Sequence, residues 1–321
     1  MAEAATKSDP MANSLSPDIP RLAELNADQV MQLAAAGAVV VLPISPLEEH
    51  GPHLPMGTDA FNAEHFACVV AELIREIAPS MPVLLAPLVP LGNHVFPFMG
   101  SINIRRRVIR DLVIDYGRSL AKTGFRRFVV VSAHGGPGHM VALDEASTIL
   151  TRYHRIKTVN LTSVIIWRFL TGKLHDRISK ALVHPLTAEE RWILAHDFHA
   201  GWWETAMMLL LRPHLVDPSY RDLPDKSLSV WRLRRFKAIR PPVGHGYLGA
   251  PARADADFAR ASLVVLREET KATLQQFLAG GWSPRHFRSP LYRMLIFRTN
   301  FRLWILAGLA ILLAVAWMLL Q

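Results

Sequence analysis

Strand-length runs of apolar residues alternate with segments of helical periodicity along most of this chain. The strand candidates are 38–44, 83–90, 126–132 and 156–166, and the helix candidates are 28–37, 60–78, 105–123 and 138–153. Runs that are apolar on both faces, such as AVVVLPI at 38–44, are typical of parallel strands covered on two sides. The alternation predicts an α/β fold with three αβα layers around a mostly parallel open sheet.

Composition narrows the classes of protein that this chain can represent. Half of its 321 residues are hydrophobic, which is enough for a sizeable buried core. Cys68 is the only cysteine, so an intramolecular disulfide and a zinc site with several thiolates are both excluded. The net charge of +9 raises nucleic acid as a partner, but the basic excess lies near the C-terminus and no recognition motif accompanies it.

The C-terminal segment 303–320 contains neither charge nor proline. At 1.5 Å per residue it covers roughly 27 to 30 Å, the thickness of a bilayer's hydrocarbon, so it predicts one transmembrane helix rather than a buried helix of a soluble core. Five arginines precede it: Arg285, Arg288, Arg293, Arg298 and Arg302. Their position predicts contact with lipid head groups and a single-pass tail anchor that leaves the rest of the chain in the cytoplasm. The basic run at 231–240 is interpreted as a solvated face or loop rather than a second lipid contact.

Four regions follow from these patterns. Residues 1–24 are expected to be a disordered lead-in, because they lack the apolar core of a signal peptide. Residues 25–280 form the predicted folded domain, 281–302 a basic juxtamembrane segment, and 303–320 the transmembrane helix.

Three polar clusters carry the candidate chemistry. The first follows the strand candidate at 38–44 and contains Glu48, Glu49, His50, His53 and Asp59. The second, His134-Gly135-Gly136, follows the strand candidate at 126–132, and the third spans 196–205 and ends with Glu204 in the first turn of a predicted helix. Ligands gather outside the carboxyl ends of parallel strands, and carboxylates with imidazoles suit a divalent ion, so the clusters together predict a metal site.

The same residues resemble the creatininase (creatinine amidohydrolase) family. The segment EEHGPHLPMGTD at 48–59 is similar to the family's E-x-H-G-P-H-L-P-x-x-T-D signature. The segment SAHGG at 132–136 resembles its N-G-H-G-G-N segment, and DFHAGWWET at 197–205 resembles D-x-H-A-G-x-x-E-T. The stretch PLGNHVFPFMGSI at 90–102 resembles a further family segment, and the likeness covers about residues 25–275.

The resemblance implies a hydrolase with two divalent metal ions, Zn, Mn or Fe, and a homo-oligomer. Its implied metal ligands are Glu48, His50, Asp59, His134 and Glu204, with Asp59 bridging the ions. Glu204 replaces a glutamate that creatininase has at the position of Gly136. Ser132 and Pro137 stand where the family has asparagines, which leaves the substrate open.

A metal-activated water that attacks an amide carbonyl is the mechanism that this ligand set predicts. His199 is the expected catalytic proton donor to the leaving nitrogen, with Glu49 or His53 in reserve. The expected function is therefore cleavage of a C–N bond in a linear or cyclic small-molecule amide. The alternative is a catalytically degenerate, membrane-tethered binding or scaffold protein on the same fold. Trp202 and Trp203 are interpreted either as a platform for a planar substrate or as core residues.

Overall fold

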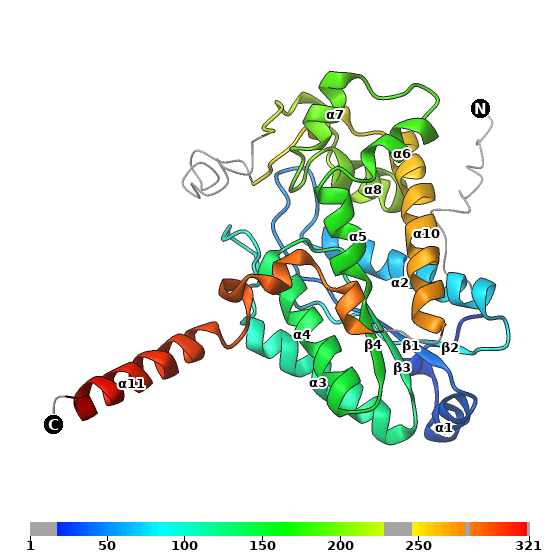
Figure 1. The fold of residues 1–321 in the computed structure, drawn as a ribbon. Helices are drawn as coiled ribbons and strands as arrows, with labels where there is room; N and C mark the ends of the chain where they lie inside the picture. Colours follow the sequence, from blue (N-terminus) through cyan, green and yellow to red (C-terminus); the bar gives the residue numbers. More distant parts are fainter. Residues whose placement is uncertain (1–17, 228–245, 280–282, 320–321) are drawn as a thin grey trace.

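A four-stranded sheet lies between layers of helices (Figure 1). The computed structural model describes residues 18–227, 246–279 and 283–319. The strands are β1 (Val39–Pro43), β2 (Val83–Leu85), β3 (Arg127–Val131) and β4 (Lys157–Asn160). They lie in the order β2-β1-β3-β4, and every neighbouring pair is parallel. The predicted α/β fold with a parallel sheet is confirmed.

Helices account for most of the remaining described chain. The α-helices are α1 (Ala27–Ala35), α2 (Thr58–Ile77), α3 (Arg106–Thr123), α4 (Pro137–Tyr153), α5 (Leu161–Leu170), α6 (His175–Ala181), α7 (Ala188–Leu194), α8 (Trp202–Leu211), α10 (Ala256–Leu278) and α11 (Phe301–Leu319). Short 3-10 helices are η1 (Leu22–Glu24), η2 (Pro213–Leu215), η3 (Pro218–Asp222), η5 (Pro251–Arg253), η6 (Pro284–Phe287), η7 (Pro290–Arg293) and η8 (Leu295–Phe297).

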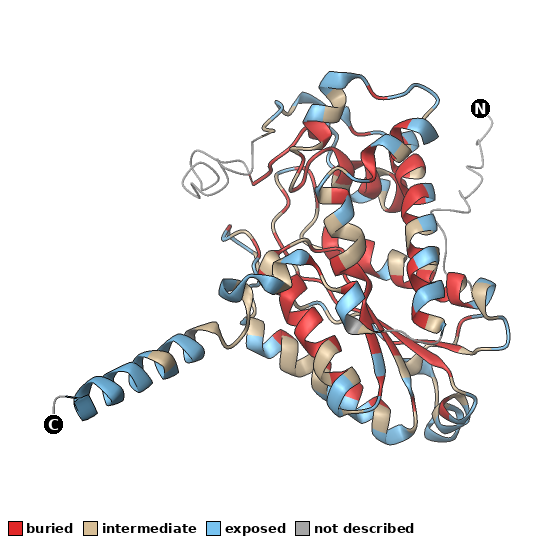
Figure 2. Ribbon diagram, in the orientation of Figure 1, coloured by how far each residue is buried: buried red, intermediate tan, exposed pale blue. Residues whose placement is uncertain are grey.

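The two faces of the sheet pack against different helices, because successive side chains of a strand point to opposite sides. Val39 and Val41 of β1 belong to the apolar cluster with α2 and the end of α10. Val40 and Leu42 belong to the cluster with α1, α3 and α4. All four side chains are fully buried, and the strands and inner helix faces form the buried centre in Figure 2. This arrangement is the predicted three-layer architecture.

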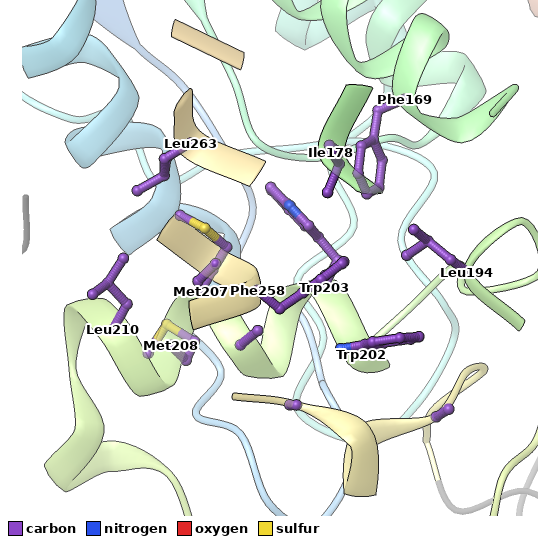
Figure 3. Close-up of a cluster of buried hydrophobic side chains, with 14 of the residues drawn as sticks. Phe169, Ile178, Leu194, Trp202, Trp203, Met207, Met208, Leu210, Phe258 and Leu263 are labelled. Atoms are coloured by element: carbon purple, nitrogen blue, oxygen red, sulfur yellow. The ribbon is translucent and has the colours of Figure 1, made fainter. Parts of the chain in front are cut away.

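A further apolar cluster lies beyond the carboxyl ends of the strands. It joins α5, α6, α7, α8 and the first half of α10 (Figure 3). Trp202 stacks on Phe258 with ring centroids 4.6 Å apart, and Trp203 lies 5.2 Å from Phe169. This cluster holds α8 in place over the strand ends.

The strand predicted at 156–166 is wrong beyond residue 160. The chain leaves the sheet there and begins α5 at Leu161. Thr162 explains the turn: its hydroxyl accepts a hydrogen bond from the Ser132 N–H at 2.6 Å and donates one to the Ser132 carbonyl at 2.8 Å. These bonds to the end of β3 override the strand preference of the β-branched residues in 156–166.

Two predicted features lie outside the described residues. They are residues 1–17 of the predicted lead-in and the basic run at 231–240. Residues 18–24 of the predicted lead-in are ordered. Ile19 is buried against the sheet, and the Leu85 N–H donates to the Pro20 carbonyl at 2.9 Å.

The predicted transmembrane anchor is not supported. The segment forms α11, which extends away from the domain and exposes apolar side chains (Figures 1 and 2). Among the described residues, no helix is long and apolar enough to cross a membrane.

The predicted lipid contacts and homo-oligomer also gain no support from the described chain. Arg298, one of the five arginines assigned to lipid, instead forms an ion pair of 2.5 Å with Glu145 of α4. The preceding short helices η6, η7 and η8 also contact α4.

We expect Leu42→Ala to lower the free energy of unfolding by about 2 to 5 kcal/mol, because it leaves a cavity between two packed layers. Leu215, which is 37% exposed, provides the matched control, and Leu215→Ala should change stability much less. Urea unfolding of both variants measures the difference. Equal losses would contradict the assignment of β1 to the centre of the core.

Candidate metal centre

The five predicted ligands come together at the carboxyl ends of β1 and β3. Glu48 and His50 lie in the loop after β1, and Asp59 lies in the first turn of α2. His134 follows β3, and Glu204 lies in the first turn of α8. Segments far apart in the sequence thus meet because parallel strands end at the same edge of the sheet.

The ligands form two groups that share Asp59. The His134 Nδ1 atom lies 3.1 Å from Glu48 Oε2 and 3.1 Å from Asp59 Oδ2. The other Asp59 oxygen, Oδ1, lies 3.7 Å from His50 Nε2, which is 3.5 Å from Glu204 Oε2. The carboxylate of Asp59 therefore stands between the two groups, one oxygen toward each.

These spacings fit bound cations. Ligand atoms about 2 Å from one ion in tetrahedral geometry stand roughly 3.4 Å apart, and the separations around Asp59 run from 3.1 to 3.7 Å. The buried Glu48 Oε2, His50 Nε2 and Asp59 Oδ2 atoms make no hydrogen bond in the described chain. Since buried polar atoms are normally satisfied, these atoms suit direct contact with a cation.

Backbone carbonyls fix how the imidazole rings are presented. His50 donates from Nδ1 to the Glu48 carbonyl at 2.9 Å, and His134 donates from Nε2 to the Asn93 carbonyl at 3.1 Å. A carbonyl oxygen only accepts, so in each neutral ring the other nitrogen carries the lone pair that faces the carboxylates. A lone pair opposed to carboxylate oxygens is unfavourable without a cation between them. Such carbonyl-held rings are the usual second layer of a metal site.

Electrostatics indicate the same need for positive charge. Burial lowers the pKa of His50, but Asp59 and Glu204 outweigh it and raise that pKa to about 10. Burial likewise opposes charge on His134, while Glu48 and Asp59 raise its pKa well above the ordinary value. Despite its burial, Asp59 has a pKa held below its usual range by the two histidines. The carboxylates therefore bind either protons on the imidazoles or metal ions in their place.

Asp197 positions the ligand of α8, a role that sequence reasoning did not assign. Its Oδ1 accepts from the Trp202 N–H at 2.7 Å, and its Oδ2 accepts from the Trp203 N–H at 2.9 Å. The carboxylate thus caps the first turn of α8, which carries Glu204. The Ala200 N–H, from a residue with φ of 48°, donates to Glu204 Oε2 at 2.5 Å. The position of Asp197 at the start of the DFHAG segment was the only sequence feature that pointed to this role.

The loop after β3 is held by groups other than the family's asparagines. The Ser132 hydroxyl contacts Ser45 Oγ at 2.9 Å and His139 Nε2 at 3.1 Å, and it accepts from the His134 N–H at 3.2 Å. Pro137 opens α4, where its fixed φ suits the first helical position. The two substitutions therefore leave His134 with a defined position.

The three predicted proton-transfer residues occupy different places. His199 joins His50 and Glu204, since one ligand atom from each lies within 4.8 Å of the others. Its Nε2 donates to the Glu49 carbonyl at 2.7 Å, so the neutral ring has its lone pair on Nδ1. Burial and the neighbouring His50 lower the pKa of His199 to about 4.

A cavity of about 510 Å³ opens beside the two groups of ligands, and the reserve residues Glu49 and His53 do not line it. His53 Nε2 contacts the Thr205 hydroxyl at 2.8 Å, and burial lowers the pKa of His53 to about 4. Burial raises the pKa of Glu49 to about 7. The contact with Thr205 joins the loop after β1 to α8, which gives His53 a positioning role.

Of the two tryptophans at the start of α8, Trp203 lines the cavity and Trp202 does not.

The protein is thus a three-layer α/β protein with a candidate two-cation centre at the strand ends. The creatininase profile, described as creatinine amidohydrolase, matches residues 23–274. The chain belongs to the creatininase family of amidohydrolases.

Individual relatives agree with this assignment. Creatinine amidohydrolase of Pseudomonas putida is 30% identical over 194 residues, which cover 58% of this chain and 69% of that protein. The mycofactocin precursor peptide peptidase of Mycobacterium tuberculosis strain H37Rv is 33% identical over 133 residues, or 39% of this chain. The chain spans about half the length of that peptidase, 52%.

Solved structures show the same fold. A creatininase variant solved in a Zn-Zn form superposes with a TM-score of 0.58 at 22% identity, covering 81% of this chain and 98% of that one. A putative creatinine amidohydrolase from Bacteroides fragilis gives a TM-score of 0.59 at 21% identity, with coverage of 82% and 98%.

Adjacent glycines provide a test of how tightly the His134 loop is built. A Cβ at position 136 would lie 2.3 Å from His134 Nε2 and 2.9 Å from the Asn93 carbonyl oxygen. A Cβ at position 135 would meet only the ends of two flexible side chains, Leu170 Cδ1 at 3.3 Å and Ile166 Cγ2 at 3.7 Å. We expect Gly136→Ala to weaken metal binding by about 10- to 100-fold, because it displaces the His134 ring from its carbonyl partner. Gly135→Ala, the matched control, should bind metal nearly as the parent does. Titration with zinc against a competing chelator measures both affinities, and equal affinities would contradict the described loop.

Proposed function

We propose that this protein is a metal-dependent amidohydrolase that cleaves the C–N bond of a linear or cyclic amide with a water activated by two divalent ions, Zn, Mn or Fe. The observation that carries the proposal is the position of Asp59 between two groups of ligand atoms. Glu48 and His134 would hold one ion, and His50 and Glu204 the other, with Asp59 shared. Such a pair of ions, when bound, lowers the pKa of a water toward neutrality and polarises the carbonyl of the substrate.

His199 is the residue that we assign to proton transfer. Its Nδ1 lone pair is available because Nε2 is bonded to the Glu49 carbonyl. Nδ1 takes the proton of the attacking water and then returns it to the leaving nitrogen, while the Glu49 carbonyl keeps the ring oriented through both steps. The ring also packs against His50 and Phe96, with centroids 4.3 and 4.6 Å away, which limits its rotation.

The relatives support amide hydrolysis in general and leave the substrate to experiment. One is named a creatinine amidohydrolase and the other a precursor peptide peptidase, and both names denote cleavage of a C–N bond. The alternative, a degenerate binding or scaffold protein, predicts that metal or activity is missing. The intact set of buried ligands favours the enzyme, since buried charges without a role are costly to maintain.

We expect the purified full chain, expressed with Zn or Mn supplied, to contain about two metal equivalents per chain and to hydrolyse members of an amide panel. Glu48→Gln and His134→Ala should each lose about one equivalent and most activity, because each removes a ligand of the same ion. Elemental analysis and product detection measure the two quantities. Less than one equivalent in the parent, together with unchanged activity in both variants, would refute the proposal.

A separate variant distinguishes the two possible roles of His199. His199→Gln should lower kcat by about 10²- to 10⁴-fold and keep both metal equivalents, because the residue transfers protons. Elemental analysis alongside kinetics provides the test. Loss of one equivalent would show instead that His199 is a metal ligand in the group with His50 and Glu204.

A further inference from the structure

A cavity of about 510 Å³ opens directly on the candidate metal centre. His134, His199 and Glu204 lie on its polar side. Most of its other walls are apolar and include Phe66, Ile165, Ile166, Leu170, Leu266 and Trp203. A volume of this size accommodates a substantial organic group rather than only the amide under attack.

Helix α5 provides one apolar wall. Its sequence, LTSVIIWRFL, has apolar residues on several faces, and Ile165, Ile166 and Leu170 remain only half-buried although they are strongly apolar. All three border the cavity. Apolar surface of this kind is stabilised when an apolar ligand group removes it from water.

A second wall comes from beyond the part of the chain that matches the family. The match ends at residue 274, whereas the cavity is also lined by Leu291, Met294 and Phe297. These residues belong to the segment 290–297, formed by η7 and η8. Phe297 contacts the His94 ring, 6.0 Å between centroids, beside the loop of His134. We call this segment the C-terminal wall.

Polar contacts fix the C-terminal wall to the domain at both ends. Before it, the Ser289 N–H donates to the buried Asp144 Oδ2 at 3.1 Å. Near its end, Arg106 donates to the Ile296 carbonyl at 2.9 Å, and Arg298 forms its ion pair with the buried Glu145. A segment held on both sides presents its side chains to the cavity in a defined arrangement.

We infer that the substrate is an amide with an extended apolar group, and that the C-terminal wall helps to select that group. The inference rests on the proposed function for the bond that is cleaved, and it adds the chemical character of the group next to that bond. An aliphatic or aryl acyl chain and the apolar side chains of a short peptide share this chemistry. The amide lies at the metal centre, and the apolar group occupies the space between α5, α10 and the C-terminal wall.

The test uses one chromogenic amine acylated with chains from acetyl to decanoyl, assayed with the metal-loaded full chain. We expect kcat/KM to rise roughly two- to fourfold per added methylene, mainly through KM, because each methylene buries more apolar surface. A parallel arm uses N-acetylglycyl and N-acetylleucyl amides of the same amine and shows whether peptides or simple acyl chains are preferred. Constant or falling kcat/KM in both arms would overturn the inference.

Two leucines of the same segment provide matched variants. Leu291 lines the cavity, whereas Leu295 is 57% exposed and does not. Leu291→Trp should lower kcat/KM for the decanoyl amide at least about tenfold relative to the acetyl amide, because the larger ring fills the space for the chain. Leu295→Trp should leave that ratio unchanged. Equal ratios in the two variants would contradict a selecting role for the C-terminal wall.

A binding measurement separates failure of this inference from failure of the proposed function. Calorimetric titration of the purified full chain with decanamide does not require hydrolysis. Binding that Leu291→Trp weakens, without hydrolysis of any amide in the panel, would support the apolar site and refute the proposed enzyme. Hydrolysis of acetyl amides without decanamide binding would support the enzyme and refute the apolar site.

Discussion

Three carboxylates with little solvent exposure lie close together, and the positive charge that they require organises the site. Glu48 and Asp59 are buried, and the side chain of Glu204 is only 16% exposed. Carboxylates this close raise each other's free energy unless a cation or proton lies between them. The imidazoles of His50 and His134 face them with ring orientations set by backbone carbonyls. The proposed pair of divalent ions would satisfy all of these groups at once.

The rest of the fold holds these groups in register. The apolar strands β1 and β3 pair along their full length and bring the loops with Glu48, His50 and His134 to one edge. Asp197 fixes the start of α8, and the apolar cluster around Trp202 and Phe258 packs against that helix (Figure 3). A core that is packed on both faces of the sheet thus gives the ligands little freedom to separate.

Much of this arrangement could be predicted from the sequence, because its signals are local. Apolar runs such as 38–44 identify buried parallel strands, and the rule that ligands gather at strand ends is enough to assign Asp59 and His134 to one site. Helix periodicity gives α2, α3 and α4 within one or two residues of their bounds.

The features that the sequence did not predict all depend on long-range contacts. Residues 161–166 have strand-forming composition, yet Thr162 bonds to the end of β3 and the chain becomes a helix. The role of Asp197 depends on the geometry of a cap that pattern alone does not reveal. The packing of residues 290–298 depends on contacts with α3 and α4, which lie 190 and 153 residues earlier in the chain. The segment itself has neither helical nor strand periodicity. Its basic residues therefore suggested lipid contact, whereas Arg298 pairs within the protein.

Anomalous X-ray diffraction from crystals grown with zinc or manganese would show whether two ions bind on either side of Asp59. We predict two anomalous peaks about 3.5 to 4 Å apart, one on each side of the Asp59 carboxylate, with Glu48 and His134 around one and His50 and Glu204 around the other. A fully loaded crystal with no peak at Asp59, or with these five side chains pointing to different places, would contradict it.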